Sequence, residues 1–213
     1  MLGANGIVGG GPPIVLGAAL TYKTKKTGNV SVGFFGDGAS NQGSISESMN
    51  MATVLKLPAI FVCEDNGFAE STAKEYAVGG SILDRGKAFG LDSYEVDGND
   101  FFAVHDAAKV VIDNARNGKG PALLHIKTSK VYGHFEGDAI SYRTKEENEK
   151  IKNEEDPLKI FKKKVTESGL LELSQLEKLE SDAKEQVKIA VEESKKADFP
   201  TEKDLLTDVY IKY

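Results

Sequence analysis

Short apolar runs alternate with longer amphipathic stretches through the first two thirds of the chain. Runs with the length and composition of buried strands span residues 30–35, 59–64, 93–96 and 122–128, and Gly, Pro or Asn bound them. Stretches with helical spacing of apolar residues occupy residues 13–26, 42–56, 81–89 and 101–117. This alternation predicts an α/β fold with a doubly wound, mostly parallel sheet.

The last third of the chain follows a different pattern. From about residue 144 it is rich in Glu and Lys, with Leu or Ile every three to four residues and few Gly. This composition predicts amphipathic helices over residues 156–167 and 174–196, followed by a tail over residues 199–213. We therefore predict an α/β domain at residues 1–143 and a helical C-terminal extension at residues 144–213.

Two polar motifs follow the first two predicted strands. Gly36-Asp37-Gly38 comes after the first strand, and Asp65-Asn66-Gly67 comes after the second. Because the carboxyl ends of neighbouring parallel strands lie side by side, we expect Asp37 and Asn66 to come together. Their carboxylate and amide oxygens are hard donors that Mg²⁺ favours, and phosphate oxygens can complete its octahedron. The pair therefore predicts a site for a metal ion and a diphosphate.

The glycine-rich turn is less specific when taken alone. Residues 36–41 fit a strand-to-helix turn whose exposed N–H groups face an anion. Asp-Gly is also an ordinary turn dipeptide, so a simple turn or a helix cap is the structural alternative. Asn66, one βα unit later, is the residue that favours ligand binding.

Composition excludes several other classes of function. The 213 residues carry a net charge of −6, and no stripe of Lys and Arg follows a nucleic-acid backbone. Cys63 is the single cysteine, so a disulfide is excluded, and its apolar run predicts a buried packing role. No apolar stretch approaches the roughly 20 residues of a membrane span. We expect a cytoplasmic protein that binds neither nucleic acid nor membranes.

Several ordered motifs at matching spacings carry a resemblance to one family. They are Gly6-Ile7-Val8-Gly9, Gly36-Asp37-Gly38-Ala39-Ser40-Asn41-Gln42-Gly43, Glu47, Asn50-Met51-Ala52, Lys56-Leu57-Pro58, Asn66-Gly67-Phe68, Tyr132-Gly133-His134-Phe135-Glu136-Gly137-Asp138 and Ser141-Tyr142-Arg143. Together they resemble the α subunit of the thiamine diphosphate-dependent decarboxylating component of 2-oxo acid and acetoin dehydrogenase complexes, and most closely the acetoin branch. The resemblance runs from residue 3 to Asp208-Val209-Tyr210, and it implies the thiamine diphosphate-binding fold.

The resemblance also implies roles for individual residues. Asp37, the Asn66 side chain and the backbone carbonyl of Phe68 would ligate Mg²⁺. Further cofactor contacts would come from two glycine-rich segments, namely Gly36, Gly38 and Ala39 at the diphosphate, and Gly6 and Val8 at the aminopyrimidine. His134 would lie near the diphosphate and the reacting centre, where it positions substrate or cofactor and transfers protons.

The function implied by the resemblance is that of an acetoin dehydrogenase α subunit, which cleaves acetoin and transfers a two-carbon unit to lipoamide. The carboxylate that activates the aminopyrimidine belongs to the β subunit in this family. The implied partners are therefore a β subunit in a heterotetramer, a lipoyl-bearing acyltransferase and a small-molecule carbonyl substrate.

Three alternatives remain at the level of sequence. One is the α subunit of a pyruvate or branched-chain 2-oxo acid dehydrogenase. Another is a non-catalytic or split subunit that binds its β partner, because the family normally has about a domain of sequence before Gly3. The third is a nicotinamide oxidoreductase built on residues 3–11, although the strand and the acidic residue expected for dinucleotide binding are missing.

Some polar residues have plain structural interpretations. His105 lies in a helical pattern and is expected to face solvent, whereas His125 lies in a predicted strand and is expected to be a core or interface residue. Glu47 is expected to form an interface hydrogen bond rather than to act in catalysis.

Overall fold

The computed structural model describes residues 3–4 and 6–207. The chain divides into two compact units, Met1–Phe161 and Lys162–Tyr213. The end of the predicted tail, and with it the Asp208-Val209-Tyr210 motif, lies outside the described residues.

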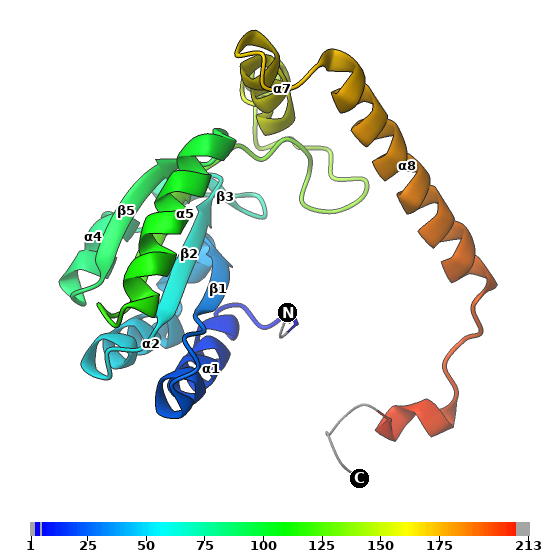
Figure 1. Cartoon of the computed structure of the whole chain (residues 1–213). Coiled ribbons are helices and arrows are strands. Elements are labelled where there is room, and N and C mark those ends of the chain that lie inside the picture. Colours follow the sequence, from blue (N-terminus) through cyan, green and yellow to red (C-terminus); the bar gives the residue numbers. More distant parts are fainter. Residues whose placement is uncertain (1–2, 5, 208–213) are drawn as a thin grey trace. The chain divides into compact units, whose positions relative to one another are not determined.

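A four-stranded parallel sheet forms the centre of the first unit (Figure 1). Its spatial order is β1 (Ser31–Gly36), β2 (Ala59–Asp65), β6 (Ala122–Lys127) and β5 (Asp92–Asp97). The register pairs Gly36 with Glu64 and Asp65 with Lys127, so these strands end at one common edge. The four predicted strands are confirmed, and so is their parallel arrangement.

Helices cover both faces of this sheet. On one face lie α1 (Gly11–Lys25), α2 (Gly43–Val54) and α4 (Ile82–Ala88), and on the other lies α5 (Phe101–Arg116), as Figure 1 shows. Neighbouring residues of β2 serve different cores, because successive side chains of a strand point to opposite faces. Phe61 and Cys63 pack in the first core, and Ile60 and Val62 pack in the second. The doubly wound fold and the buried packing role of Cys63 are thus confirmed.

Short elements connect and follow this α/β core. They are the 3₁₀ turn η1 (Gly38–Asn41), the hairpin of β3 (Phe68–Ala69) and β4 (Thr72–Ala73), the single turn α3 (Lys74–Ala77), and α6 (Lys145–Glu154). The sequence pattern predicts neither the hairpin nor α6. Because the first compact unit includes α6, it extends past residue 143, and the division of the chain at that residue stays a prediction.

The later helices are those the sequence predicts. α7 (Pro157–Glu167) and α8 (Leu173–Lys196) match the two predicted amphipathic stretches, and η2 (Glu202–Leu206) follows them. An ion pair of 2.6 Å between Lys184 and Glu180, one helical turn apart, lies on the exposed surface of α8. None of the helices in the described part of the chain is long and apolar enough to cross a membrane.

A capping box begins α6. The Thr144 hydroxyl accepts a hydrogen bond from the backbone N–H of Glu147 at 3.1 Å, and the Glu147 carboxylate accepts one from the N–H of Thr144 at 2.7 Å. These bonds satisfy two N–H groups that the start of a helix leaves without partners. They define a helix start in a segment with little apolar periodicity.

We expect Thr144→Ala to weaken α6 by about 1 kcal/mol, because the first turn loses its side-chain acceptor. Amide hydrogen exchange within α6 measures this loss as reduced protection. Thr144→Ser keeps the hydroxyl and serves as the matched control. Equal protection in all three proteins would show that the capping box does not stabilise the helix.

Candidate functional site

Asp37 occupies the position directly after β1, and only 2% of it is exposed. Among the described residues, its buried Oδ2 atom has no hydrogen-bond partner. Burial is the main cause that raises the pKa of Asp37, and the charge of Asp65 adds to it, while the Gly38 N–H and the Lys74 ammonium act in the opposite direction. A buried carboxylate oxygen without a partner is unfavourable, so this geometry suits a bound cation.

Arg85 of α4 fixes the turn that follows Asp37. Its guanidinium donates to the side-chain oxygen of Asn41 at 2.9 Å, to the carbonyl of Ser40 at 3.2 Å and to the carbonyl of Gly79 at 2.6 Å. These bonds tie η1 to the loop before α4. The turn is therefore held in place by an element outside the βαβ unit.

Gly38 allows η1 to approach the β3 hairpin. A Cβ atom added at residue 38 would lie 2.4 Å from the Cβ of Ala69, closer than real Cβ atoms approach one another. Only glycine fits this contact without movement of one of the two backbones. The contact brings the turn after β1 against the loop after β2.

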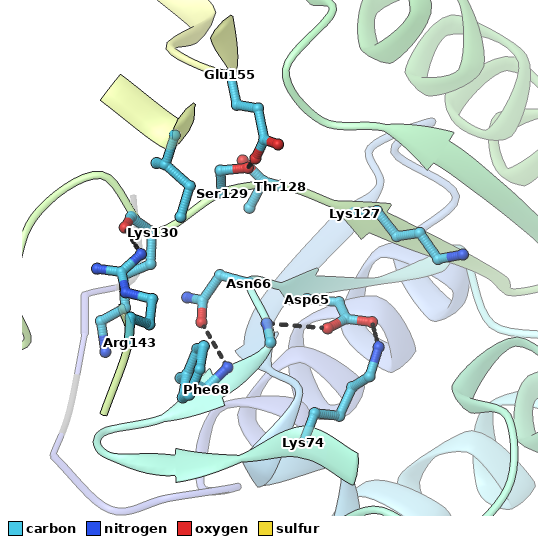
Figure 2. Close-up of a pocket in the computed structure, with 12 residues that line it drawn as sticks. Asp65, Asn66, Phe68, Lys74, Lys127, Thr128, Ser129, Lys130, Arg143 and Glu155 are labelled. Carbon is cyan, nitrogen blue, oxygen red and sulfur yellow. Dashed lines mark hydrogen bonds and ion pairs between the residues drawn. The ribbon is translucent and has the colours of Figure 1, made fainter. Parts of the chain in front are cut away.

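The second predicted motif forms a tight loop after β2 (Figure 2). The Gly67 N–H donates to the Asp65 carboxylate at 3.3 Å, and the Phe68 N–H donates to the side-chain oxygen of Asn66 at 3.2 Å. Gly67 has a φ angle of +83°, a conformation that favours glycine. The loop presents Asn66 at the same edge of the sheet as Asp37.

Asp65 is the most heavily bonded residue of this loop. Its Oδ2 atom accepts from Lys74 Nζ at 2.7 Å and from His125 Nε2 at 2.7 Å. Burial by itself would raise the pKa of Asp65, but the bonds from Lys74 and His125 outweigh it and lower that pKa. The side chain is only 2% exposed, so this buried charge depends on hydrogen bonds from its two partners.

The structure confirms two of the plain interpretations. His125 is 4% exposed and packs inside the first unit, where it bonds to Asp65. His105 is exposed and lies 3.1 Å from Asp106. Sequence reasoning missed the link between His125, Asp65 and Lys74. The only indication in the sequence is Asp65 itself, an acidic residue directly after a predicted buried strand, since a buried charge requires a partner.

A pocket of about 290 Å³ opens beside this loop. Figure 2 shows Asn66 and Phe68 on one side of it, and Ser129 and Glu155 on another. Its charged lining residues are Asp65, Lys74, Lys127, Lys130, Arg143 and Glu155. The described residues contain no cluster of three or more His, Cys, Asp or Glu side chains able to hold a metal ion. A metal at this edge would therefore need other oxygen ligands as well, from amide side chains, backbone carbonyls, a cofactor or water.

His134 lies in an exposed loop that Asp138 organises. The Asp138 carboxylate accepts from the N–H of His134 at 2.8 Å, from the N–H of Ile140 at 2.9 Å and from the Tyr142 hydroxyl at 3.0 Å. The two backbone bonds are the main cause that lowers the pKa of Asp138. The centroids of the Tyr142 and Phe68 rings lie 5.0 Å apart. This aromatic contact packs the His134 loop against the loop that carries Asn66.

The structure does not bring every predicted residue into one pocket. His134 lines a separate hollow within its own loop, and its Nδ1 atom lies 3.4 Å from Lys130 Nζ. Gly6 and Val8 lie in an exposed segment that is attached near the start of α2, where the Ser44 hydroxyl donates to the Gly9 carbonyl at 2.9 Å. Asp37, Gly36, Gly38 and Ala39 do not line the pocket beside Asn66 either. The metal and cofactor roles of all the predicted site residues stay predictions.

The sheet, the orphaned carboxylate and the glycine turn define a cofactor-binding α/β protein. A family model for the dehydrogenase E1 component matches residues 1–203, and the chain belongs to this family. The resemblance predicted from the motifs is therefore confirmed. Membership of the family implies thiamine diphosphate as the cofactor.

Individual relatives match along the whole chain. The α subunit of acetoin:2,6-dichlorophenolindophenol oxidoreductase from Cupriavidus necator is 48% identical, and that from Bacillus subtilis is 46% identical. Each match covers 100% of this chain and 64% of the relative. The pyruvate dehydrogenase E1 component α subunit of Zymomonas mobilis is 40% identical over 98% of this chain and 59% of the relative. The chain thus spans less than two thirds of the length of these relatives.

Proposed function

We propose that this chain is the α component of an acetoin-cleaving dehydrogenase that binds Mg²⁺ and thiamine diphosphate at the carboxyl edge of its sheet. The observation that carries this proposal is the buried Oδ2 atom of Asp37, which lacks a partner among the described residues. The turn that carries Asp37 packs against the loop that carries Asn66. The chain is also 48% and 46% identical to two α subunits named for acetoin. Pyruvate and branched-chain 2-oxo acids are the alternative substrates.

The donor set of this edge fits the proposed cofactor. Asp37, the Asn66 side chain and the Phe68 carbonyl would hold Mg²⁺, which favours such hard oxygen donors. Gly36, Gly38 and Ala39 would contact the diphosphate, and the tight contact of Gly38 with Ala69 leaves no room for a side chain there. When bound, thiamine diphosphate supplies the electron sink for cleavage of a bond next to a carbonyl group.

The remaining residues of the site bind and position. Gly6 and Val8 would meet the aminopyrimidine through backbone groups. His134 would orient the substrate and move protons at the reacting centre, and Asp138 keeps its loop folded through the bond to the His134 N–H. The chain would work with a β subunit in a heterotetramer and pass the two-carbon unit to a lipoyl-bearing acyltransferase.

Turnover of acetoin tests this function directly. The chain is co-expressed with its β subunit, and reduction of 2,6-dichlorophenolindophenol is followed with acetoin and with pyruvate. We expect activity that requires thiamine diphosphate and Mg²⁺, with at least tenfold higher kcat/KM for acetoin, a difference of about 1.4 kcal/mol. A higher kcat/KM for pyruvate than for acetoin would instead favour the pyruvate dehydrogenase α subunit. Absence of cofactor-dependent activity with both substrates would remove the enzyme assignment.

The second candidate function is that of a binding subunit without catalysis. It is favoured by one observation, namely that His134 lines a hollow of its own and not the pocket beside Asn66. Thermal unfolding of the purified complex separates the two candidates, because a ligand that binds the folded state raises its midpoint. Complex formation without protection by thiamine diphosphate and Mg²⁺ would favour the binding subunit.

A further inference from the structure

Two carboxylates, Asp65 and Glu95, and the His125 imidazole form a row across neighbouring strands near the edge that carries the site. His125 of β6 stands in register with Cys63 of β2 and Glu95 of β5. One ring nitrogen, Nε2, lies 2.7 Å from Asp65 Oδ2, and the other, Nδ1, lies 3.3 Å from Glu95 Oε2. The imidazole is 5% exposed and is held between two carboxylates. In the described structure Nδ1 makes no hydrogen bond, so the bond between Nε2 and Asp65 is the one that orients the ring.

Asp65 connects this row of side chains to the turn that carries the proposed metal ligand Asn66. Asp65 Oδ2 accepts hydrogen bonds from His125 Nε2 and Lys74 Nζ, and Asp65 Oδ1 accepts one from the Gly67 N–H. A buried carboxylate keeps one orientation only while its hydrogen bonds are made. The Gly67 N–H belongs to the turn between Asn66 and Phe68, and these two residues are joined by a 3.2 Å bond of their own.

His125 is the partner of Asp65 that lies deepest in the fold. The Lys74 side chain is 27% exposed, whereas that of His125 is 5% exposed and comes from the central part of the sheet. Loss of the exposed partner can be compensated by water, but loss of the buried partner cannot. The position of the Asn66 turn thus depends on a histidine in a different strand.

We propose that His125 is a positioning residue for the metal ligands of this site. It acts through Asp65, which holds the turn that presents Asn66 and the Phe68 carbonyl, and it touches neither metal nor cofactor. The proposal rests on the proposed function, because it assigns these two residues to Mg²⁺. Outer partners of this kind set the orientation of metal ligands, and their removal typically costs about 10–100-fold in metal affinity.

The test is a calorimetric titration of Mg²⁺ into the complex of this chain with its β subunit, in the presence of saturating thiamine diphosphate. His125→Leu removes the donor to Asp65, and His125→Gln keeps a side-chain donor near the position of Nε2. Leu123→Ala is the matched control, because Leu123 is fully buried two residues earlier on the same strand and face. This substitution weakens core packing and leaves His125, Asp65 and Glu95 unchanged. Should His125→Leu fail to fold, His125→Asn, whose amide is too short to reach Asp65, replaces it.

We expect His125→Leu to bind Mg²⁺ at least tenfold more weakly than wild type, and His125→Gln and Leu123→Ala to remain within about threefold. Equal Mg²⁺ affinity in His125→Leu and wild type would overturn the positioning role and leave the proposed function intact. An equal loss in Leu123→Ala would also overturn it, because general loosening would then explain the effect. If the wild-type protein shows no saturable Mg²⁺ binding that requires thiamine diphosphate, both the proposed function and the positioning role are wrong.

Discussion

Asp37→Asn is expected to abolish Mg²⁺-dependent binding of thiamine diphosphate and, at the same time, to stabilise the metal-free chain at neutral pH. The first effect follows from the loss of a charged ligand, which we expect to weaken Mg²⁺ at least 100-fold, or about 2.7 kcal/mol. The second follows from burial, because wild type holds a carboxylate that is 2% exposed and has an oxygen without a partner in the described structure. Opposite signs for binding and stability are typical of a residue that serves a ligand rather than the fold.

The stability effect has a defined pH dependence. The pKa of Asp37 is raised above its ordinary value of 3.8 in the folded chain, mainly by burial. The folded chain therefore retains this proton to a higher pH than the unfolded chain does. As pH rises from the ordinary pKa to the raised one, wild type loses stability relative to Asp37→Asn, and the difference persists at neutral pH. Below both pKa values the two proteins should unfold at similar temperatures.

Thermal unfolding between pH 3 and pH 8 without metal, together with cofactor titration at pH 7, measures both effects. Asp106→Asn is the charge-matched control, since its carboxylate is 82% exposed. We expect the midpoint temperature of unfolding of Asp37→Asn to exceed that of wild type by several degrees at pH 7. At acid pH the two midpoint temperatures should be equal. Wild-type cofactor affinity in the variant would remove Asp37 from the ligand set. Lower stability than wild type at pH 7 would show that Asp37 stabilises the fold.

The main strands and the convergence of the two motifs could be predicted because they depend on local sequence and simple topology. A parallel strand covered on both faces is a continuous apolar run, as in residues 59–63. Once two such strands are neighbours, the residues that follow them share an edge. The β3–β4 hairpin could not be predicted this way, because strands of two residues show no periodicity.

The support of the site could not be predicted, because its partners are distant in sequence. Asp65 bonds to a lysine nine positions later and to a histidine 60 positions later, and the second pairing exists only through the register of β2 and β6. From sequence, Asp65 is only the acidic neighbour of the proposed ligand Asn66. In the structure it is a buried charge, and the hydrogen bonds from Lys74 and His125 compensate for its burial.

Gly38→Ala is expected to damage both the fold and the cofactor site, and a second substitution should separate the two effects. The added Cβ would lie 2.4 Å from the Cβ of Ala69, so η1 or β3 must move. Such overpacking costs about 1–3 kcal/mol of unfolding free energy. Because Gly38 lies between Asp37 and Ala39, movement of η1 also displaces residues proposed to hold the metal and the diphosphate. Denaturant unfolding and titration with Mg²⁺ and thiamine diphosphate report the two losses.

Ala69→Gly in the Gly38→Ala background removes the atom that the new Cβ would strike. We expect the double variant to regain most of the stability, because the steric conflict is the main cost at this position. Its cofactor affinity then decides the role of the turn. If a methyl group at residue 38 also obstructs the diphosphate, affinity stays low although stability recovers; if affinity returns with stability, Gly38 serves only the packing of η1 against β3. Ala69→Gly alone is the control, and wild-type stability in Gly38→Ala alone would show that η1 and β3 do not pack as described.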